Sequence, residues 1–284
     1  MDFLKKNSNK IALSLGAAAV IVGGFMLFRQ NSVTVIKPDG ETVTLSTATP
    51  TSLPNQSVVF VKDDKYLTAV EKLKPVAQAE LAGSGLTKQT IIQINQLVIY
   101  VFKEDYLRIF ADGRRLRRKF IDSPELYLRE FTKHSTEAEK LMENASLEVL
   151  RDLNISMDKY EQCCERIIQT DPQFAMFNLY MFESLKMQLP SSSPHAIDKE
   201  GLIKVLSCQA EQFQTTAFDS LNLPPQQLVA LKQTYASDRA AMRYNFEDED
   251  LLKNQALLQD PDVMMHHQKL QQLILGSAGD EFGF

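Results

Sequence analysis

The longest apolar stretch without a charged side chain covers residues 11–28 and is bounded by Lys10 and Arg29. Its eighteen residues would form a helix of roughly 27 Å at about 1.5 Å per residue, close to the ~30 Å hydrocarbon core of a bilayer. A cleaved signal peptide is the competing interpretation, because the lysines before the stretch resemble the start of one. No small-x-small cleavage site follows, so the pattern favours a retained transmembrane helix after a short basic tail, residues 1–10.

The flanking charges predict an orientation for this segment. Lysines are denser before it than after it, so the positive-inside rule places the tail on the cytoplasm-like side, which in a mitochondrion is the matrix. The rest of the chain is then expected on the other side of the membrane. Small residues also recur along one side of the segment and predict a helix-packing face, formed by Ala12, Gly16, Ala19 and Gly23. The alternative is that small residues are simply common in membrane helices.

After this segment, β-branched residues flank a turn sequence. Pro38 restricts φ in the turn and Gly40 allows a positive φ, so the two flanking runs are expected to pair as a β-hairpin. Residues 46–57 are rich in Ser, Thr and Pro and predict an extended linker, and residues 58–61 could add a third strand. The region 29–62 is therefore predicted to be a hairpin followed by a linker.

Helical periodicity begins after the linker and predicts a mainly α-helical domain over residues 63–275, with a flexible tail at residues 276–284. The apolar segment Ile91–Phe110 is expected to be the central buried helix, ended by residues 112–113. The alternative interpretation is a second membrane span, but polar and charged residues interrupt the segment. Its β-branched content leaves a strand as the minority interpretation.

Several helix starts can be predicted from single residues. Ser or Asp precedes Pro at four places: Ser123–Pro124, Asp171–Pro172, Ser193–Pro194 and Asp260–Pro261. A side-chain oxygen can cap free backbone amides, and a proline at the first helical position has no amide to satisfy. Ser156 predicts one further start, for a helix over residues 157–170.

The charge of the chain limits the classes of molecule that it is expected to bind. A formal net charge of -5 argues against general nucleic-acid binding. The strongest local feature is a basic run near the middle of the chain, formed by Arg114, Arg115, Arg117, Arg118 and Lys119. We expect it to contact anionic lipid or an acidic partner surface, and we expect neutralising its arginines to leave the fold intact. The alternative is an ordinary solvated helix face.

No pattern predicts a catalytic, cofactor or metal site. The three cysteines, Cys163, Cys164 and Cys208, lack zinc-ligand spacing and are interpreted as buried thiols. The adjacent His266 and His267 would point in different directions on a helix. The acidic residues 247–250 resemble a cation-binding cluster, but acidic residues are also favoured at a helix start. Nucleophile elbows, phosphate loops, dinucleotide fingerprints and metalloprotease motifs do not occur in the sequence.

One further helical stretch is more apolar than an exposed helix requires. Its apolar positions are Phe174, Met176, Phe177, Tyr180, Met181, Phe182, Leu185 and Met187. Such a stripe is interpreted as core, or as core together with an interface.

These patterns favour a non-enzymatic, single-pass membrane protein that serves as an accessory subunit of a multi-subunit membrane complex, with other membrane-protein subunits as partners. Among membranes, the short Gly/Ala-rich span and its Lys-rich tail favour the mitochondrial inner membrane. The alternative is a membrane-tethered adaptor or receptor whose helical domain binds a partner protein.

Overall fold

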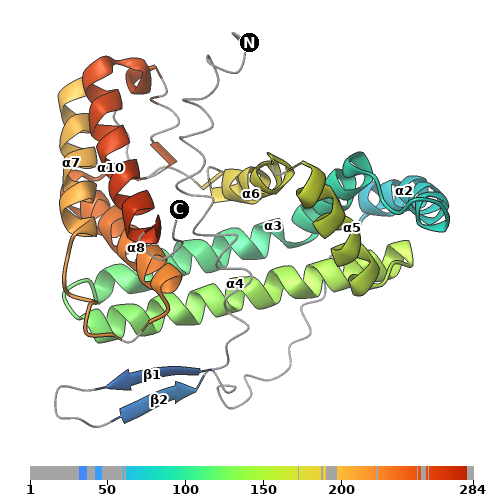
Figure 1. Ribbon diagram of the computed structural model, residues 1–284, viewed down its shortest axis with the longest axis horizontal. Coiled ribbons are helices and arrows are strands. Elements are labelled where there is room, and N and C mark those ends of the chain that lie inside the picture. The colour runs from blue at the N-terminus through green and yellow to red at the C-terminus, as the bar shows by residue number, and fades with distance from the viewer. Residues whose placement is uncertain are drawn as a thin grey trace. The chain divides into compact units, whose positions relative to one another are not determined.

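The computed structural model describes residues 32–36, 42–46, 60, 62–171, 173–186, 188–189, 197–221, 223–247, 249–250, 254 and 256–279, and this part of the chain is mainly α-helical (Figure 1). The predicted membrane segment, residues 11–28, and its packing face lie outside these residues. Within the described part of the chain, no helix combines the length and the apolar character that crossing a membrane requires.

Two short strands precede the helices. Strand β1 (Ser32–Ile36) pairs antiparallel with strand β2 (Thr42–Ser46), which places Val33 opposite Leu45 and Val35 opposite Val43. The turn between the strands and most of the predicted linker lie outside the described residues.

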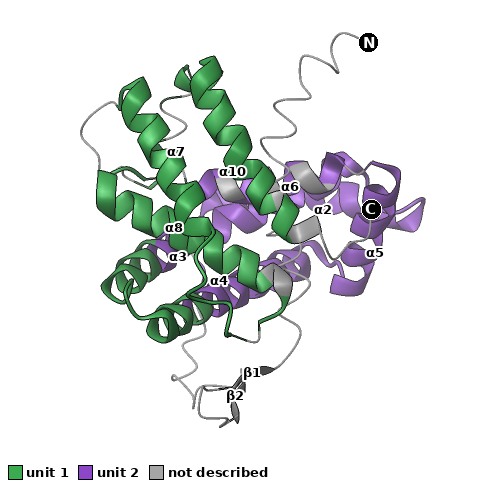
Figure 2. Ribbon diagram, turned by 60° about the vertical axis from the view of Figure 1, so that its left-hand side comes forward, with its two compact units in different colours: residues 1–52, 111–133, 186–284 green, residues 53–110, 134–185 purple. Residues whose placement is uncertain are grey.

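The chain divides into two compact units (Figure 2). Unit 1 comprises residues 1–52, 111–133 and 186–284, and unit 2 comprises residues 53–110 and 134–185. Helices α3 (Lys88–Lys119) and α4 (Pro124–Leu153) each contribute residues to both units. The residues predicted to form one helical domain are thus shared between two units.

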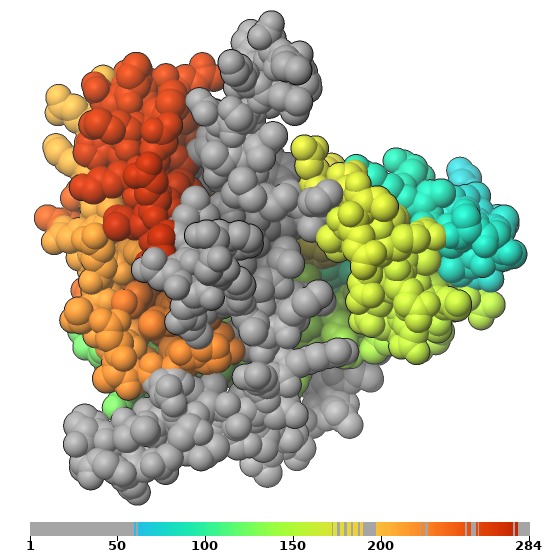
Figure 3. Space-filling view, viewed as in Figure 1, coloured from blue at the N-terminus to red at the C-terminus, as the bar shows by residue number. Residues whose placement is uncertain are grey.

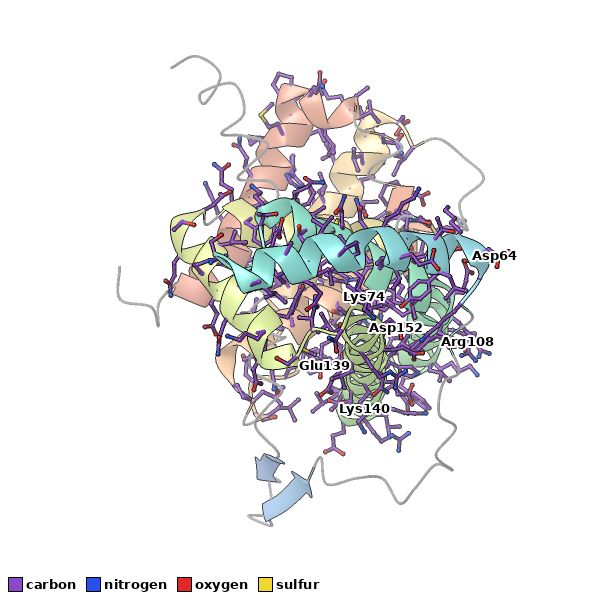
Figure 4. The ribbon with its side chains drawn as sticks, turned by 90° about the vertical axis from the view of Figure 1, so that its right-hand side faces the viewer. Asp64, Lys74, Arg108, Glu139, Lys140 and Asp152 are labelled. Atoms are coloured by element: carbon purple, nitrogen blue, oxygen red, sulfur yellow. The ribbon has the colours of Figure 1, made fainter. Side chains whose placement is uncertain are left out.

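Unit 2 contains helices α2 (Asp64–Ala82), α5 (Met157–Thr170) and α6 (Gln173–Lys186), together with parts of α3 and α4. Its core is centred on the fully buried Phe102, whose ring lies edge-on to Tyr106 at 5.5 Å. The predicted central segment, residues 91–110, therefore supplies core residues to this unit. Lys62 lies just before α2, and its ammonium pairs with Asp152 of α4 at 2.7 Å. Figure 4 labels Asp152.

Unit 1 contains helices α7 (Lys199–Phe213), α8 (Pro225–Tyr244) and α10 (Pro261–Gly279), and the short 3-10 helix η1 (Leu257–Gln259). Figures 1 and 3 show α7 and α10 side by side. Their shared core includes Leu206, Phe213, Val263 and Ile274. A second apolar cluster surrounds Tyr127 and includes Phe218, Leu231 and Tyr235.

Local capping explains where several helices begin. Helix α4 begins at Pro124 and α10 at Pro261, as predicted. Ser156 caps α5, because its hydroxyl oxygen accepts a hydrogen bond from the Lys159 amide at 3.3 Å. Helix α6 begins at Gln173, next to the predicted start at Asp171–Pro172, whereas the predicted start at Ser193–Pro194 lies outside the described residues. Helix α7 instead has Asp198 as its cap, at 2.7 Å from the Gly201 amide.

Two predicted helix ends are wrong. Helix α3 does not stop at residues 112–113 but continues to Lys119. A single glycine costs a helix only about 1 kcal/mol, which is too little to end a helix whose following residues make contacts elsewhere in the fold. Helix α10 likewise continues to Gly279, so the predicted tail at residues 276–284 begins with helix.

Gly85, between α2 and α3, has a positive φ of 87°. Arg166 of α5 holds this connection by donating hydrogen bonds to the carbonyl oxygens of Ser84 and Leu86. A Cβ atom at position 85 would lie 2.9 Å from Nη1 of Arg166 and 3.2 Å from Sγ of Cys163. The positive φ therefore favours glycine at this position, and any other side chain would also displace the end of the Arg166 side chain.

We expect Gly85→Ala to lower the free energy of unfolding by about 1–2 kcal/mol, because an L side chain is strained at positive φ and would displace Arg166. Gly83→Ala is the matched control, because the nearest atoms to its added Cβ are 3.7 Å away. Urea denaturation followed by circular dichroism measures both. Equal losses in the two variants would contradict the proposed requirement for glycine.

Candidate functional site

The basic run at the end of α3 is divided between two sides of the helix. Arg114, Arg117 and Arg118 form ion pairs with carboxylates of unit 1. Arg115 and Lys119 are exposed. This division follows from helical geometry, because residues three or four positions apart lie on the same side of a helix. Arg114 therefore shares a side with Arg117 and Arg118, and Arg115 shares another side with Lys119.

Arg117 lies in the interior of unit 1. Its Nε atom donates to Oδ2 of Asp238 at 3.0 Å, and the Tyr127 hydroxyl donates to the same oxygen at 2.7 Å. Arg117 is 6% exposed and Asp238 3% exposed. Burial alone would lower the pKa of Arg117, but the charge of Asp238, the contribution of Tyr127 and the hydrogen bonds together outweigh that effect, and the pKa is raised. Arg117 therefore remains a charged, internally paired residue.

Arg118 connects two acidic residues from different parts of unit 1. Its Nε atom donates to Oδ1 of Asp238 at 3.0 Å, and its two terminal nitrogens donate to the two oxygens of Glu247 at 2.7 and 2.6 Å. Such a bidentate pair is among the stronger hydrogen-bonded arrangements in proteins. Burial would lower the pKa of Arg118, but the hydrogen bonds with Glu247 and the charges of Asp238 and Glu247 raise it.

Arg114 lies one helical turn before Arg118 and also pairs with two carboxylates. Its Nη2 atom donates to Oε1 of Glu249 at 2.5 Å, and its Nη1 atom lies 3.1 Å from Oε2 of Glu247. We call the group of seven residues the arginine–carboxylate cluster; it comprises Arg114, Arg117, Arg118, Tyr127, Asp238, Glu247 and Glu249.

The acidic residues 247–250 contribute directly to this cluster. Glu247 and Glu249 pair with the arginines, and the Glu247 amide donates to Oδ2 of Asp250 at 3.0 Å. Oε2 of Glu249 is buried without a hydrogen-bond partner among the described residues. Nowhere in the described ranges do three or more potential metal ligands gather. The acidic partner of these arginines is thus a segment of the same chain.

Two predicted site residues remain available to other molecules. Arg115 pairs only locally, with Asp112 at 3.0 Å, and its side chain is 65% exposed. Lys119 is also exposed. Contact with anionic lipid or an acidic partner stays a prediction for the run, and Arg115 and Lys119 are the residues best placed for it.

Sequence reasoning did not identify Asp238 or Tyr127 as partners of the basic run. Neither residue belongs to a charge run, and Asp238 is more than a hundred positions from Arg117. The pairing of the basic run with the acidic residues 247–250 could have been predicted from the sequence. These are the strongest basic and acidic runs of the chain, and their charges are complementary.

The cysteines show no feature of reactive thiols in the structure. Cys163 and Cys208 are buried, as predicted, and Cys164 is partly buried; none of the three forms a disulfide. Burial, the largest effect, raises the pKa of the Cys164 thiol to about 11. A thiol with this pKa is protonated at neutral pH and is a poor nucleophile or metal ligand.

Helix α6 contributes both core and exposed apolar side chains. Phe174 is fully buried, and Phe182 stacks on Phe102 with ring centroids 6.1 Å apart. The side-chain nitrogen of Asn95 donates to the side-chain oxygen of Asn178 at 3.1 Å, and this hydrogen bond connects α3 with α6. Phe177 is 42% exposed. The apolar stripe therefore contributes to the core of unit 2 and also places an aromatic ring at the surface.

Glu139 and Glu143 lie one turn apart on α4, and Figure 4 labels Glu139. Burial, with a smaller contribution from the charge of Glu143, raises the pKa of Glu139 to about 7. The folded protein therefore binds this proton more tightly than the unfolded chain does. The contribution of this proton to the free energy of unfolding is complete below the pKa that Glu139 has in the unfolded chain. It is lost as pH rises through the pKa that Glu139 has in the folded protein.

We expect Glu139→Gln to raise the melting temperature at about pH 8 and to change it little at about pH 4, because the variant avoids the cost of a buried charge. Thermal melts at both pH values measure the effect. The exposed Glu104 provides the control, since Glu104→Gln makes the same chemical change without burial. A stabilisation that is equal at both pH values would show that the buried charge is not its cause.

The cluster cannot supply a general acid or base through its arginines, which remain charged at every physiological pH. Its chemistry is charge neutralisation and the connection of α3 with α8 and with Glu247 and Glu249. No protein-family model, curated protein or solved structure gives a significant match to this chain.

Proposed function

We propose that this chain is a non-enzymatic accessory subunit of a multi-subunit membrane complex, anchored by a transmembrane helix at residues 11–28. A hairpin ribbon at residues 29–62 follows the anchor in this proposal, and the helical units bind other membrane-protein subunits. The mitochondrial inner membrane is the proposed location, with the N-terminal tail in the matrix. The uncharged apolar length of the segment and its lysine-rich flank support this topology.

One observation carries the proposed role in assembly: helix α6 exposes an aromatic ring while other apolar side chains of the same helix are buried. Phe174 and Leu185 bury their side chains in that core, whereas Phe177 is 42% exposed on the same helix. Aromatic residues are enriched where proteins bind one another, because they bury a large area with few rotatable bonds. An exposed ring beside a buried apolar helix is therefore a suitable anchor for a partner subunit.

The decisive experiment is native electrophoresis of the full chain in mild detergent, with identification of the chains that migrate with it. A discrete large assembly supports the accessory-subunit proposal. Phe177→Ser is expected to reduce incorporation into that assembly. Leu147→Ser is the matched control, because Leu147 is 48% exposed on α4 and belongs to no aromatic stripe.

A membrane-tethered adaptor is the second candidate. It is favoured by the separate buried cores of unit 1 and unit 2, which give each unit its own apolar stabilisation. In the same electrophoresis, an adaptor would migrate as a monomer and would bind its partner only when that partner is added. An assembly that withstands dilution would argue against this candidate.

The proposed anchor is tested separately. The full chain is expected to stay in the membrane pellet after alkaline carbonate extraction. Val20→Arg is expected to reduce insertion, at a cost of about 2.5–3.5 kcal/mol on the translocon scale. Release of the unaltered protein by carbonate would contradict the anchor, whatever the electrophoresis shows.

A further inference from the structure

The two strongest charge runs of the chain neutralise each other within unit 1. The basic residues at 114–119 and the acidic residues at 247–250 are separated by more than a hundred positions. Three ion pairs join them, from Arg114 to Glu247, from Arg114 to Glu249 and from Arg118 to Glu247. The basic run is therefore not free to use all of its charge on another molecule.

These contacts differ from the deeper pair of Arg117 and Asp238. The side chains of Arg114 and Arg118 are 14% and 21% exposed, whereas the side chain of Arg117 is 8% exposed. Glu247 and Glu249 hold the two outer guanidinium groups while those groups keep some access to solvent. An arginine side chain is long and flexible, so donors that lose an internal partner can turn toward solvent. For Arg118 these donors are the two terminal nitrogens, because its Nε atom also donates to Asp238.

We infer that Glu247 and Glu249 form an autoinhibitory contact, which occupies donors of Arg114 and Arg118 that would otherwise bind the phosphate groups of an anionic lipid surface. The inference rests on the proposed membrane anchor, because the anchor would bring the lipid surface close to the chain. It assigns a role to the acidic run that the proposed function does not include.

The chemistry of the guanidinium group supports lipid phosphate as the competing ligand. Both terminal nitrogens of Arg118 donate to the two oxygens of Glu247, a fork arrangement that carboxylate and phosphate accept equally well. Arg115 and Lys119 are exposed on the same helix and would add charge to such a contact. Without the two glutamates, the terminal nitrogens of Arg114 and Arg118 would add to the positive charge that Arg115 and Lys119 present, while Nε of Arg118 still donates to Asp238.

The test uses the full chain, reconstituted in phosphatidylcholine nanodiscs and mixed with phosphatidylcholine vesicles that contain phosphatidylserine. Flotation measures the protein that binds the vesicles. We expect Glu247→Gln with Glu249→Gln to increase vesicle affinity on the order of tenfold, since each basic residue near an anionic membrane contributes appreciably to binding. The gain is expected to disappear at high salt.

Three further variants make the result specific. Glu200→Gln with Glu211→Gln changes the net charge equally at exposed positions of α7 and is expected to give no comparable gain. Adding Arg114→Gln and Arg118→Gln to the first variant is expected to abolish its gain. Glu249→Gln alone should give a smaller gain, and it can be measured even if the double variant folds poorly.

The inference is overturned if neither glutamate variant binds the vesicles more tightly than the unaltered chain does. It is also overturned if the α7 control gains as much, since net charge alone would then be the cause, or if the released arginines bind an acidic protein but not the vesicles. Failure of the proposed anchor would appear differently, as a chain that does not enter the nanodiscs. The same flotation can then be performed on the chain in solution.

Discussion

Replacing Asp238 by alanine is expected to lower the free energy of unfolding by about 3–5 kcal/mol, because the change leaves a buried guanidinium without its partner. Asp238 is 3% exposed and accepts hydrogen bonds from Arg117, Arg118 and Tyr127. Its loss removes the acceptor for all three donors, and Arg117 has little access to water in compensation. Chemical denaturation of the full chain in detergent, followed by circular dichroism, measures the change.

Asp122 is the matched control for this prediction. It also pairs with an arginine, Arg239, at 2.7 Å, but its side chain is 82% exposed. An exposed ion pair contributes about 0–1 kcal/mol, so Asp122→Ala should have a much smaller effect. Similar losses in the two variants would mean that burial of the Asp238 pair does not determine its contribution.

The burial of Arg117 also corrects an expectation drawn from the sequence. Neutralising Arg114, Arg115, Arg117 and Arg118 together was expected to leave the fold intact, as is usual for surface substitutions. Its premise is wrong for Arg117, which is only 6% exposed and pairs with a buried carboxylate, so we now expect the quadruple variant to be destabilised. A lipid-binding test of the run should therefore change the exposed Arg115 and Lys119 first.

Replacing Phe102 by alanine is expected to lower the free energy of unfolding by about 3–5 kcal/mol, since a cavity remains where the ring was. Phe102 is fully buried in unit 2, and its ring packs against Tyr106 and Phe182. The loss contains the transfer free energy of the ring and the dispersion contacts that its neighbours no longer make. Thermal and urea denaturation measure the effect.

Ile99 provides the comparison for Phe102 on the same helix. It packs against the same core but is only partly buried, so Ile99→Ala should destabilise the protein less than Phe102→Ala. Unchanged stability in both variants would remove this part of α3 from the core. A larger loss at Ile99 than at Phe102 would show that burial does not rank these positions.

Local sequence rules located the helix starts that depend on one or two neighbouring residues. Pro124, Ser156 and Pro261 lie where predicted, because a cap or an N-terminal proline acts within a single turn of helix. The ends of α3 and α10 were harder to predict. A glycine weakens a helix only slightly, and contacts made elsewhere in the fold decide whether the helix continues.

The candidate site, too, could be predicted only in part from the sequence. The sequence displays a basic run and an acidic run, and complementary charge is a reason to expect attraction between them. It contains no signal that divides the basic run into paired and exposed members. That division depends on the rotation of α3 against residues 238 and 247–249, which is a property of packing.

The mainly α-helical character of the described part of the chain could be predicted from the sequence, because helical periodicity and capping are local properties. The sequence also predicted that Cys163 and Cys208 are buried and that Phe174 belongs to a core. Three features became visible only with the packed helices: the division into two units, the outward position of Phe177 against the inward position of Phe174, and the burial of Arg117 with Asp238. Each of these depends on contacts between residues far apart in the chain, and the free energy of such contacts exists only after the helices have packed.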